Sequence, residues 1–159
     1  MKQADIGITE QNRQSIVGIL ENLLADEYVL YTKTRNYHWN VTGPHFNEYH
    51  ETFEEQYDGL SDDIDEIAER IRSLGFKASS TLSEFQKNSQ LKEHPEEHPD
   101  ANTMVSNLLA DHEKIIQTIR EKTPEISGQY GDVGTEDFLV GLMEKHEKTA
   151  WMLRSILEK

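Results

Sequence analysis

Four long stretches in which apolar residues recur every three or four positions constrain the fold more than any other feature of the sequence. They cover about residues 10–39, 44–74, 101–122 and 135–158. This spacing is typical of helices that bury one face, and no segment shows the alternation expected of a half-buried strand. The sequence therefore predicts an all-α protein.

Local signals mark the ends of the stretches. Thr9 can cap the first helix through its hydroxyl, and Gly43-Pro44 separates the first helix from the second. Gly75 is placed to stop the second helix. Pro124 is expected to end the third helix, because the residue before a proline avoids helical backbone angles. We expect the last helix to begin near Thr135.

The connections between the helices predict their arrangement. A short turn joins the first two stretches, which favours an antiparallel pair. About 25 residues separate the second from the third, and there Thr81 and Glu84 have the spacing of a capping box. We expect a short helix over about 82–89. Two helices, a long link and two more helices form a ferritin-like four-helix bundle. No repeat or linker divides the chain, so one domain is expected over residues 1–159, with residues 1–9 as a tail.

The amino-acid composition excludes several kinds of site and partner. The 159 residues include no cysteine, which excludes disulfides and thiolate metal sites. Without an apolar signal core or a membrane-spanning stretch, the chain is expected to be cytoplasmic, with no membrane partner. Thirty acidic residues against sixteen basic ones give a net charge of −14. That charge serves either solubility or the attraction of cations, and it disfavours direct binding of nucleic acid.

The second predicted helix carries two pairs of candidate metal ligands. His50 and Glu54 form one pair, and Asp65 and Glu69 form the other. Residues four apart lie on one face of a helix, so each pair can hold one ion. His38, near the end of the first helix, reaches a similar depth to His50 if the two helices are antiparallel. Such a mixed nitrogen and carboxylate set suits Fe(II), Zn(II) or Mn(II).

Helix length separates the two pairs. Glu54 and Asp65 are eleven positions apart, or roughly 16 Å along a helix axis. One ion cannot bridge that distance within one chain. The pairs are therefore separate sites, or a second chain brings its Asp65 and Glu69 to this chain's histidines across a two-fold axis. The sequence permits both arrangements.

The remaining histidines have weaker patterns. His94 and His98 are each followed by a proline and are expected in a loop, with an adventitious site at most. His112 and His146 have no acid at a helical spacing that singles them out, and His45 is assigned no role. No histidine follows an acid by three positions, so the Glu-x-x-His motif of di-iron carboxylate bundles is missing.

Several segments together resemble the Dps family. They are NYHWNVTGPHF at residues 36–46, followed by His50, Phe53, Glu54 and Tyr57, then DEIAERI at residues 65–71 with Leu74-Gly75, DHE at residues 111–113, and HEKTAWML at residues 146–153. The resemblance extends over nearly the whole chain from about Gln14.

The resemblance implies a function and a site. It implies a ferritin-like bundle, assembled through two-fold dimers into a hollow shell of twelve subunits. Such a shell oxidises Fe(II), preferentially with hydrogen peroxide, and stores ferric mineral, which protects the cell and its DNA from oxidative damage. By position, His38, His50 and Glu54 of one subunit match the family's ligands, and so do Asp65 and Glu69 of the partner subunit. Iron is thus the expected substrate, and zinc fits the same ligands.

Other features match the family less closely. Glu54 stands where an aspartate is usual. Trp39 matches an aromatic residue near the family's site, with core packing as the alternative. Asp132 and Asp137 resemble its pore acids, although Asp137 equally suits a helix start.

The family also includes members that bind DNA, often through a flexible basic tail. Here the tail carries only Lys2 before Arg13, so direct DNA binding is disfavoured and association with the nucleoid is left open. Two functions remain as alternatives to the ferroxidase: sequestration of a divalent metal without redox chemistry, and DNA packing by a structural protein.

Overall fold

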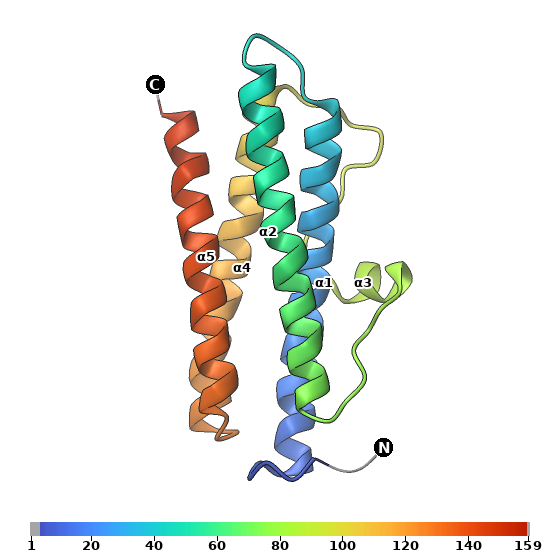
Figure 1. Ribbon diagram of the computed structural model, residues 1–159, viewed down its shortest axis with the longest axis vertical. Helices are drawn as coiled ribbons and strands as arrows, with labels where there is room; N and C mark the ends of the chain where they lie inside the picture. The colour runs from blue at the N-terminus through green and yellow to red at the C-terminus, as the bar shows by residue number, and fades with distance from the viewer. Residues whose placement is uncertain (1–3, 159) are drawn as a thin grey trace.

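The computed structural model describes residues 4–158, which contain five helices and no strand (Figure 1). These are α1 (Glu10–Asn40), α2 (Phe46–Ser73), α3 (Leu82–Asn88), α4 (Ala101–Gly128) and α5 (Val133–Leu157). The long helices run side by side, α1 packs mainly on α2, and α4 packs mainly on α5. This is the predicted ferritin-like bundle with a short extra helix. None of the helices within residues 4–158 has the length and apolar character needed to cross a bilayer.

The predicted helix ends are largely confirmed. The Thr9 hydroxyl accepts a hydrogen bond from the Asn12 amide at 3.2 Å. Thr81 and Glu84 form the capping box of α3. Gly75 follows α2 with a φ of +92°, a left-handed conformation that glycine adopts without strain. The predicted tail begins with residues 1–3, which lie outside the described residues.

The predicted end of the third long helix at Lys122 is wrong. α4 continues through Pro124 to Gly128. Proline removes one backbone donor but leaves the turns on either side able to pair. There the Thr123 hydroxyl donates to the Ile119 carbonyl, and Ile126 is fully buried. Packing of this last turn therefore outweighs the local cost of the proline.

The fourth long helix begins earlier than predicted. α5 starts at Val133, two positions before Thr135, because the Asp132 carboxylate caps it by accepting from the Thr135 amide at 2.9 Å. The loop between α4 and α5 is correspondingly short.

The link between α2 and α4 is fastened to α1. Phe85 of α3 is buried and stacks on Tyr28 of α1, with ring centroids 4.3 Å apart. After α3, the backbone amide of Gln90 and the hydroxyl of Ser89 donate to the buried Asp26 carboxylate at 2.8 and 2.7 Å. The long link is thus held on the α1 side, and it leaves the outer face of α2 uncovered (Figure 1).

Candidate metal centre

The end of α1 and the start of α2 bring three of the predicted ligands together. Each of His38, His50 and Glu54 has a ligand atom within 4.8 Å of those of the other two. His38 is buried, His50 is half-buried and Glu54 is exposed. The tight turn at Gly43, with a φ of +120°, reverses the chain so that His38 faces His50. The cluster therefore opens to the surface on its carboxylate side.

A reciprocal pair of hydrogen bonds orients the two imidazoles. The Nδ1 of His38 lies 2.8 Å from the His50 carbonyl oxygen, and the Nδ1 of His50 lies 2.8 Å from the His38 carbonyl oxygen. A carbonyl can only accept, so both Nδ1 atoms carry protons, and in the uncharged rings both Nε2 atoms keep lone pairs. The rings stack with centroids 3.7 Å apart. The polypeptide backbone thus sets the tautomer that metal coordination requires.

Aromatic rings enclose this pair. Tyr57 meets His38 edge-on at 5.2 Å, and Phe46 stacks on His50 at 5.0 Å. The Tyr57 hydroxyl points to Glu54 Oε1 at 3.4 Å. Desolvation and the neighbouring acids Glu54 and Asp58 raise the pKa of Tyr57, so its phenol stays protonated and remains a donor. The rings restrict the two imidazoles to one orientation.

Trp39 does not pack in the core. Its side chain is 65% exposed, and the guanidinium of Arg35 lies over its ring at 5.1 Å from the centroid. The same guanidinium lies 4.9 Å from the centre of the Tyr57 ring. Trp39 is therefore joined to the histidine cluster through Arg35 and Tyr57, and its alternative role as a core residue is excluded.

The second predicted pair lies elsewhere on the same helix. Asp65 and Glu69 are exposed on α2 and are not in the cluster of His38, His50 and Glu54. α2 is continuous from Phe46 to Ser73, so Glu54 and Asp65 stay roughly 16 Å apart along its axis. One chain therefore presents three of the five predicted ligands at one place and the other two at another.

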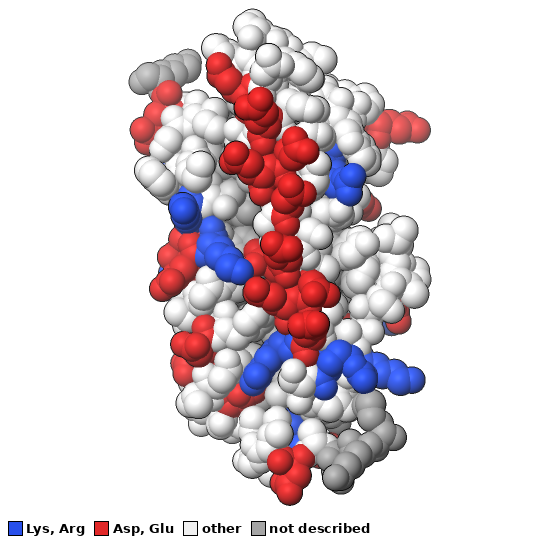
Figure 2. Space-filling view, in the orientation of Figure 1, with Lys and Arg blue, Asp and Glu red and all other residues white. Residues whose placement is uncertain are grey.

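The exposed face of α2 is strongly acidic. Figure 2 shows a line of acidic side chains running down the middle of the molecule, where α2 lies in Figure 1. The exposed acids of this helix are Glu48, Glu51, Glu54, Glu55, Asp58, Asp62, Asp65, Glu66 and Glu69. Its only basic residues are Arg70 and Arg72, near its end. The ligand pairs thus lie within a surface that attracts cations.

The two predicted pore acids differ in accessibility. Asp132 is 3% exposed, and its carboxylate accepts from Arg70 Nη2 at 3.1 Å as well as from Thr135. Asp137 is exposed. Asp132 therefore has a structural role at the start of α5, and Asp137 is the one whose side chain is accessible. A pore role for either stays a prediction.

Asp132 should make the stability depend on pH. Burial alone would raise its pKa, but hydrogen bonds from Thr135 and the charge of Arg70 outweigh burial and lower it. A lowered pKa stabilises the fold above the unfolded value of about 3.9, and this contribution is lost as the pH falls through the folded value. In urea unfolding, the stability difference between wild type and Asp132→Asn should be constant above about pH 5 and shrink below it. Asp137→Asn is the control, and a difference that does not vary with pH would contradict the assignment.

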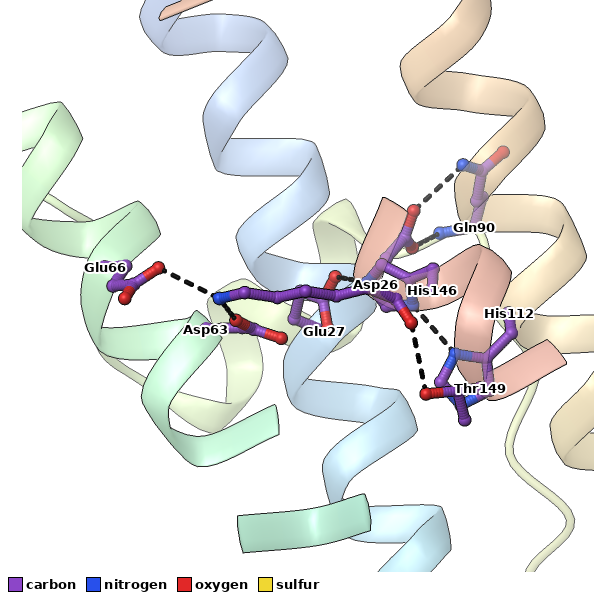
Figure 3. A network of polar contacts seen from close by, with 9 residues as sticks. Asp26, Glu27, Asp63, Glu66, Gln90, His112, His146 and Thr149 are labelled. Atoms are coloured by element: carbon purple, nitrogen blue, oxygen red, sulfur yellow. Dashed lines mark hydrogen bonds and ion pairs between the residues drawn. The ribbon is translucent and has the colours of Figure 1, made fainter. Parts of the chain in front are cut away.

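The structure also reveals a buried polar chain that the sequence pattern did not indicate. His146 Nε2 lies 2.6 Å from Glu27 Oε1, and its Nδ1 lies 2.8 Å from the Nδ1 of His112 (Figure 3). All three side chains are at most 2% exposed. The carboxylate comes from α1 and the imidazoles from α4 and α5, so no spacing within one helix could signal it. Burial and the charge of His146 hold the pKa of His112 well below its usual range, whereas Glu27 raises the pKa of His146 against the effect of burial.

The other histidines lie outside both groups. His94 and His98 are in the loop before α4, as expected, and the His94 Nδ1 lies 3.8 Å from the Glu97 carboxylate. His45 precedes α2 and lies 3.1 Å from Glu48. None of them belongs to a three-ligand cluster among the described residues.

Comparisons with known proteins agree with this architecture. A family model described as a ferritin-like domain matches residues 17–159. A low temperature-induced protein of Nostoc sp., itself uncharacterized, is 44% identical over 99% of this chain and 88% of its own. DNA protection during starvation protein 2 of Bacillus anthracis is 38% identical over 93% of this chain and 99% of its own. The crystal structure of the Dps protein from Vibrio cholerae O1, described as a ferritin-like diiron-carboxylate protein, has a TM-score of 0.91 and 35% identity over 99% of this chain and 98% of its own.

Proposed function

Because the chain belongs to the Dps family of ferritin-like proteins, we propose that it oxidises Fe(II) and stores the ferric product inside a shell of identical subunits. The observation that carries the proposal is the cluster of His38, His50 and Glu54, in which the backbone holds both Nε2 lone pairs ready for a metal. The relatives' names support protection of DNA as the wider purpose.

The centre is completed by a second subunit. Three ligands on a surface-facing cluster leave coordination positions open, and Asp65 and Glu69 lie exposed and unused farther along α2. A two-fold axis that crosses α2 between these two groups of ligands brings the histidine cluster of one subunit against Asp65 and Glu69 of the partner subunit. Each dimer then holds two composite sites, and each site has two imidazoles and three carboxylates. Repeated dimers build the shell, for which we propose twelve members.

The ligands favour oxidation of iron. Carboxylates are hard ligands that stabilise Fe(III) over Fe(II), so they lower the cost of removing an electron. Two Fe(II) ions held together reduce one peroxide by two electrons: 2 Fe²⁺ + H₂O₂ + 2 H⁺ gives 2 Fe³⁺ + 2 H₂O. One Fe(II) alone supplies a single electron and releases a hydroxyl radical. A composite site that holds iron in pairs therefore consumes peroxide without radical release, and we propose peroxide as the preferred oxidant.

The acidic face of α2 helps the protein to collect Fe(II) and to store ferric iron. Its exposed carboxylates raise the local concentration of Fe(II) and offer oxygen ligands on which ferric ions gather. Zn(II) accepts the same nitrogen and oxygen ligands as Fe(II) and is expected to compete for the site.

The test of this function is anaerobic. Fe(II) is added to the metal-free protein, followed by hydrogen peroxide in a ratio of one to two irons, and ferric absorbance and hydroxyl-radical yield are recorded. Wild type should oxidise Fe(II) faster than buffer and with little radical. His38→Ala should lose this rate, whereas His45→Ala, a nearby exposed histidine, should keep it. Oxidation no faster than buffer in wild type would instead support sequestration of a divalent metal without redox chemistry.

Direct binding to DNA should be weak. The chain has a net charge of −14, and the Arg13 guanidinium is 4% exposed because it donates to the carbonyls of Ala4 and Ile8. Lys2 lies outside the described residues. Because the sixteen basic residues are outnumbered by thirty acids and Arg13 is not free to reach a phosphate, little affinity is gained from counterion release. The metal-free protein should leave duplex DNA unretarded in a gel at physiological salt, and a clear shift would favour the DNA-packing alternative.

A further inference from the structure

A second place for a cation lies on the other side of α2. α2 and α5 meet at few points, and between them is a cavity of about 440 Å³. It is lined by Gln56, Asp63 and Glu66 of α2, by His112 of α4, and by Lys145 and His146 of α5, among others. Gln56 follows Glu54 by two positions, about 200° around the helix, so the cavity and the first centre lie on opposite sides of α2.

Two buried polar atoms, on residues that line this cavity, have no hydrogen-bond partner among residues 4–158. They are the Nε2 of His112, whose residue is 2% exposed, and the Oε1 of Gln56. Nearly all buried polar groups in folded proteins are hydrogen-bonded, so such atoms indicate a ligand that the chain itself does not supply. One atom is an imidazole nitrogen and the other an amide oxygen, and both atom types coordinate divalent cations.

The chain of buried groups behind His112 holds its ring in place. The Nδ1 of His112 lies 2.8 Å from His146, which in turn lies 2.6 Å from the Glu27 carboxylate (Figure 3). When His146 is uncharged, donates to Glu27 and accepts from His112, the Nε2 of His112 keeps a free lone pair. Metal-bound histidines are commonly supported in this way, with a carboxylate behind the ring. Burial lowers the pKa of His112, so its ring is uncharged as a ligand must be.

Charge at the cavity also favours a cation. Four acids line it, namely Glu55, Asp62, Asp63 and Glu66, against the two lysines Lys145 and Lys148. Lys145 is already neutralised, since its Nζ lies 2.6 Å from Asp63 Oδ1 and 3.3 Å from Glu66 Oε2. The remaining excess of negative charge attracts cations and repels anions.

We propose that each subunit binds one borderline divalent cation in this cavity through His112 Nε2 and Gln56 Oε1, with water completing its coordination. The cavity has room for an ion that keeps several water ligands. The site needs no second subunit and no oxidant, so it goes beyond the proposed ferroxidase and stands apart from it.

The test uses Co²⁺ and the assembled protein in which the first centre has been removed by His38→Ala and His50→Ala. Calorimetric titration should still detect about one Co²⁺ per chain, with visible absorption bands typical of nitrogen ligation. Adding His112→Phe should weaken binding at least about tenfold. Adding Gln56→Leu, at a half-buried position that tolerates substitution better, should also weaken it. His94→Ala, in the loop before α4, should leave binding unchanged.

Two results would overturn the proposal. One is that no Co²⁺ binds once the first centre is removed. The other is that Co²⁺ binding survives both His112→Phe and Gln56→Leu, which would assign it to surface carboxylates. Because no iron is oxidised and the first centre is absent, neither result bears on the ferroxidase function, and failure of that function would leave this test unchanged.

Discussion

Two variants that are inactive alone should regain activity when they assemble together. One carries His38→Ala and His50→Ala, and the other carries Asp65→Ala and Glu69→Ala. Each lacks two of the five ligands of every composite site, because one chain holds the histidines and the carboxylate pair at separate places. In an equal mixture that pairs at random, half of the dimers contain both chains, and one of their two sites is intact. About a quarter of the wild-type rate of Fe(II) oxidation should therefore return.

The controls decide what a negative result means. The chains are unfolded and refolded together so that subunits exchange, and differently tagged chains are recovered in one particle to prove mixing. Mixing the assembled shells without unfolding should give no recovery. If proven mixed dimers remain inactive, the metal centre lies within one chain and the two-fold arrangement is wrong.

Replacing Phe53 with alanine should be among the most destabilising single changes near the centre. Phe53 is fully buried on the inner face of α2, one turn from His50, and its ring packs against Tyr37 and Tyr49 with centroids 6.4 and 6.1 Å away. Truncating a buried phenylalanine costs about 3–5 kcal/mol, because apolar contacts are lost and a cavity remains. Urea unfolding, followed by circular dichroism at a fixed protein concentration, measures the change.

Phe46 provides the matched control. It is also a phenylalanine on α2, but it is 40% exposed and stacks on His50 with ring centroids 5.0 Å apart. Phe46→Ala should cost much less than Phe53→Ala. Equal losses for the two variants would mean that the inner face of α2 does not form the core that holds the two histidines.

Much of the fold could be predicted because its signals are local. The apolar spacing indicated each long helix, and Thr9, Gly75 and the Thr81–Glu84 box marked ends that the structure confirms. The prediction failed where tertiary packing overrides a local preference. Pro124 reads as a stop, yet α4 continues because the turn that follows buries Ile126.

In the candidate site, too, the features that depend on local spacing could be predicted, and those that depend on tertiary packing could not. His50 and Glu54 lie on one helix, and a short turn separates them from His38, so spacing alone could anticipate that these three would meet. The buried chain through His112 and His146 could not be anticipated, since its carboxylate, Glu27, is 119 residues from His146 along the chain. Only the packing of α1 against the other pair of helices brings them together.

A crystal structure of the assembled protein loaded with iron or zinc, with the metal located by anomalous scattering, would show directly whether two subunits share the metal centre. We predict a metal between His38, His50 and Glu54 of one subunit and Asp65 and Glu69 of its two-fold partner. Metal held by His38, His50 and Glu54 with no ligand from a second chain, or subunits whose two-fold contact leaves those acids facing solvent, would contradict this prediction.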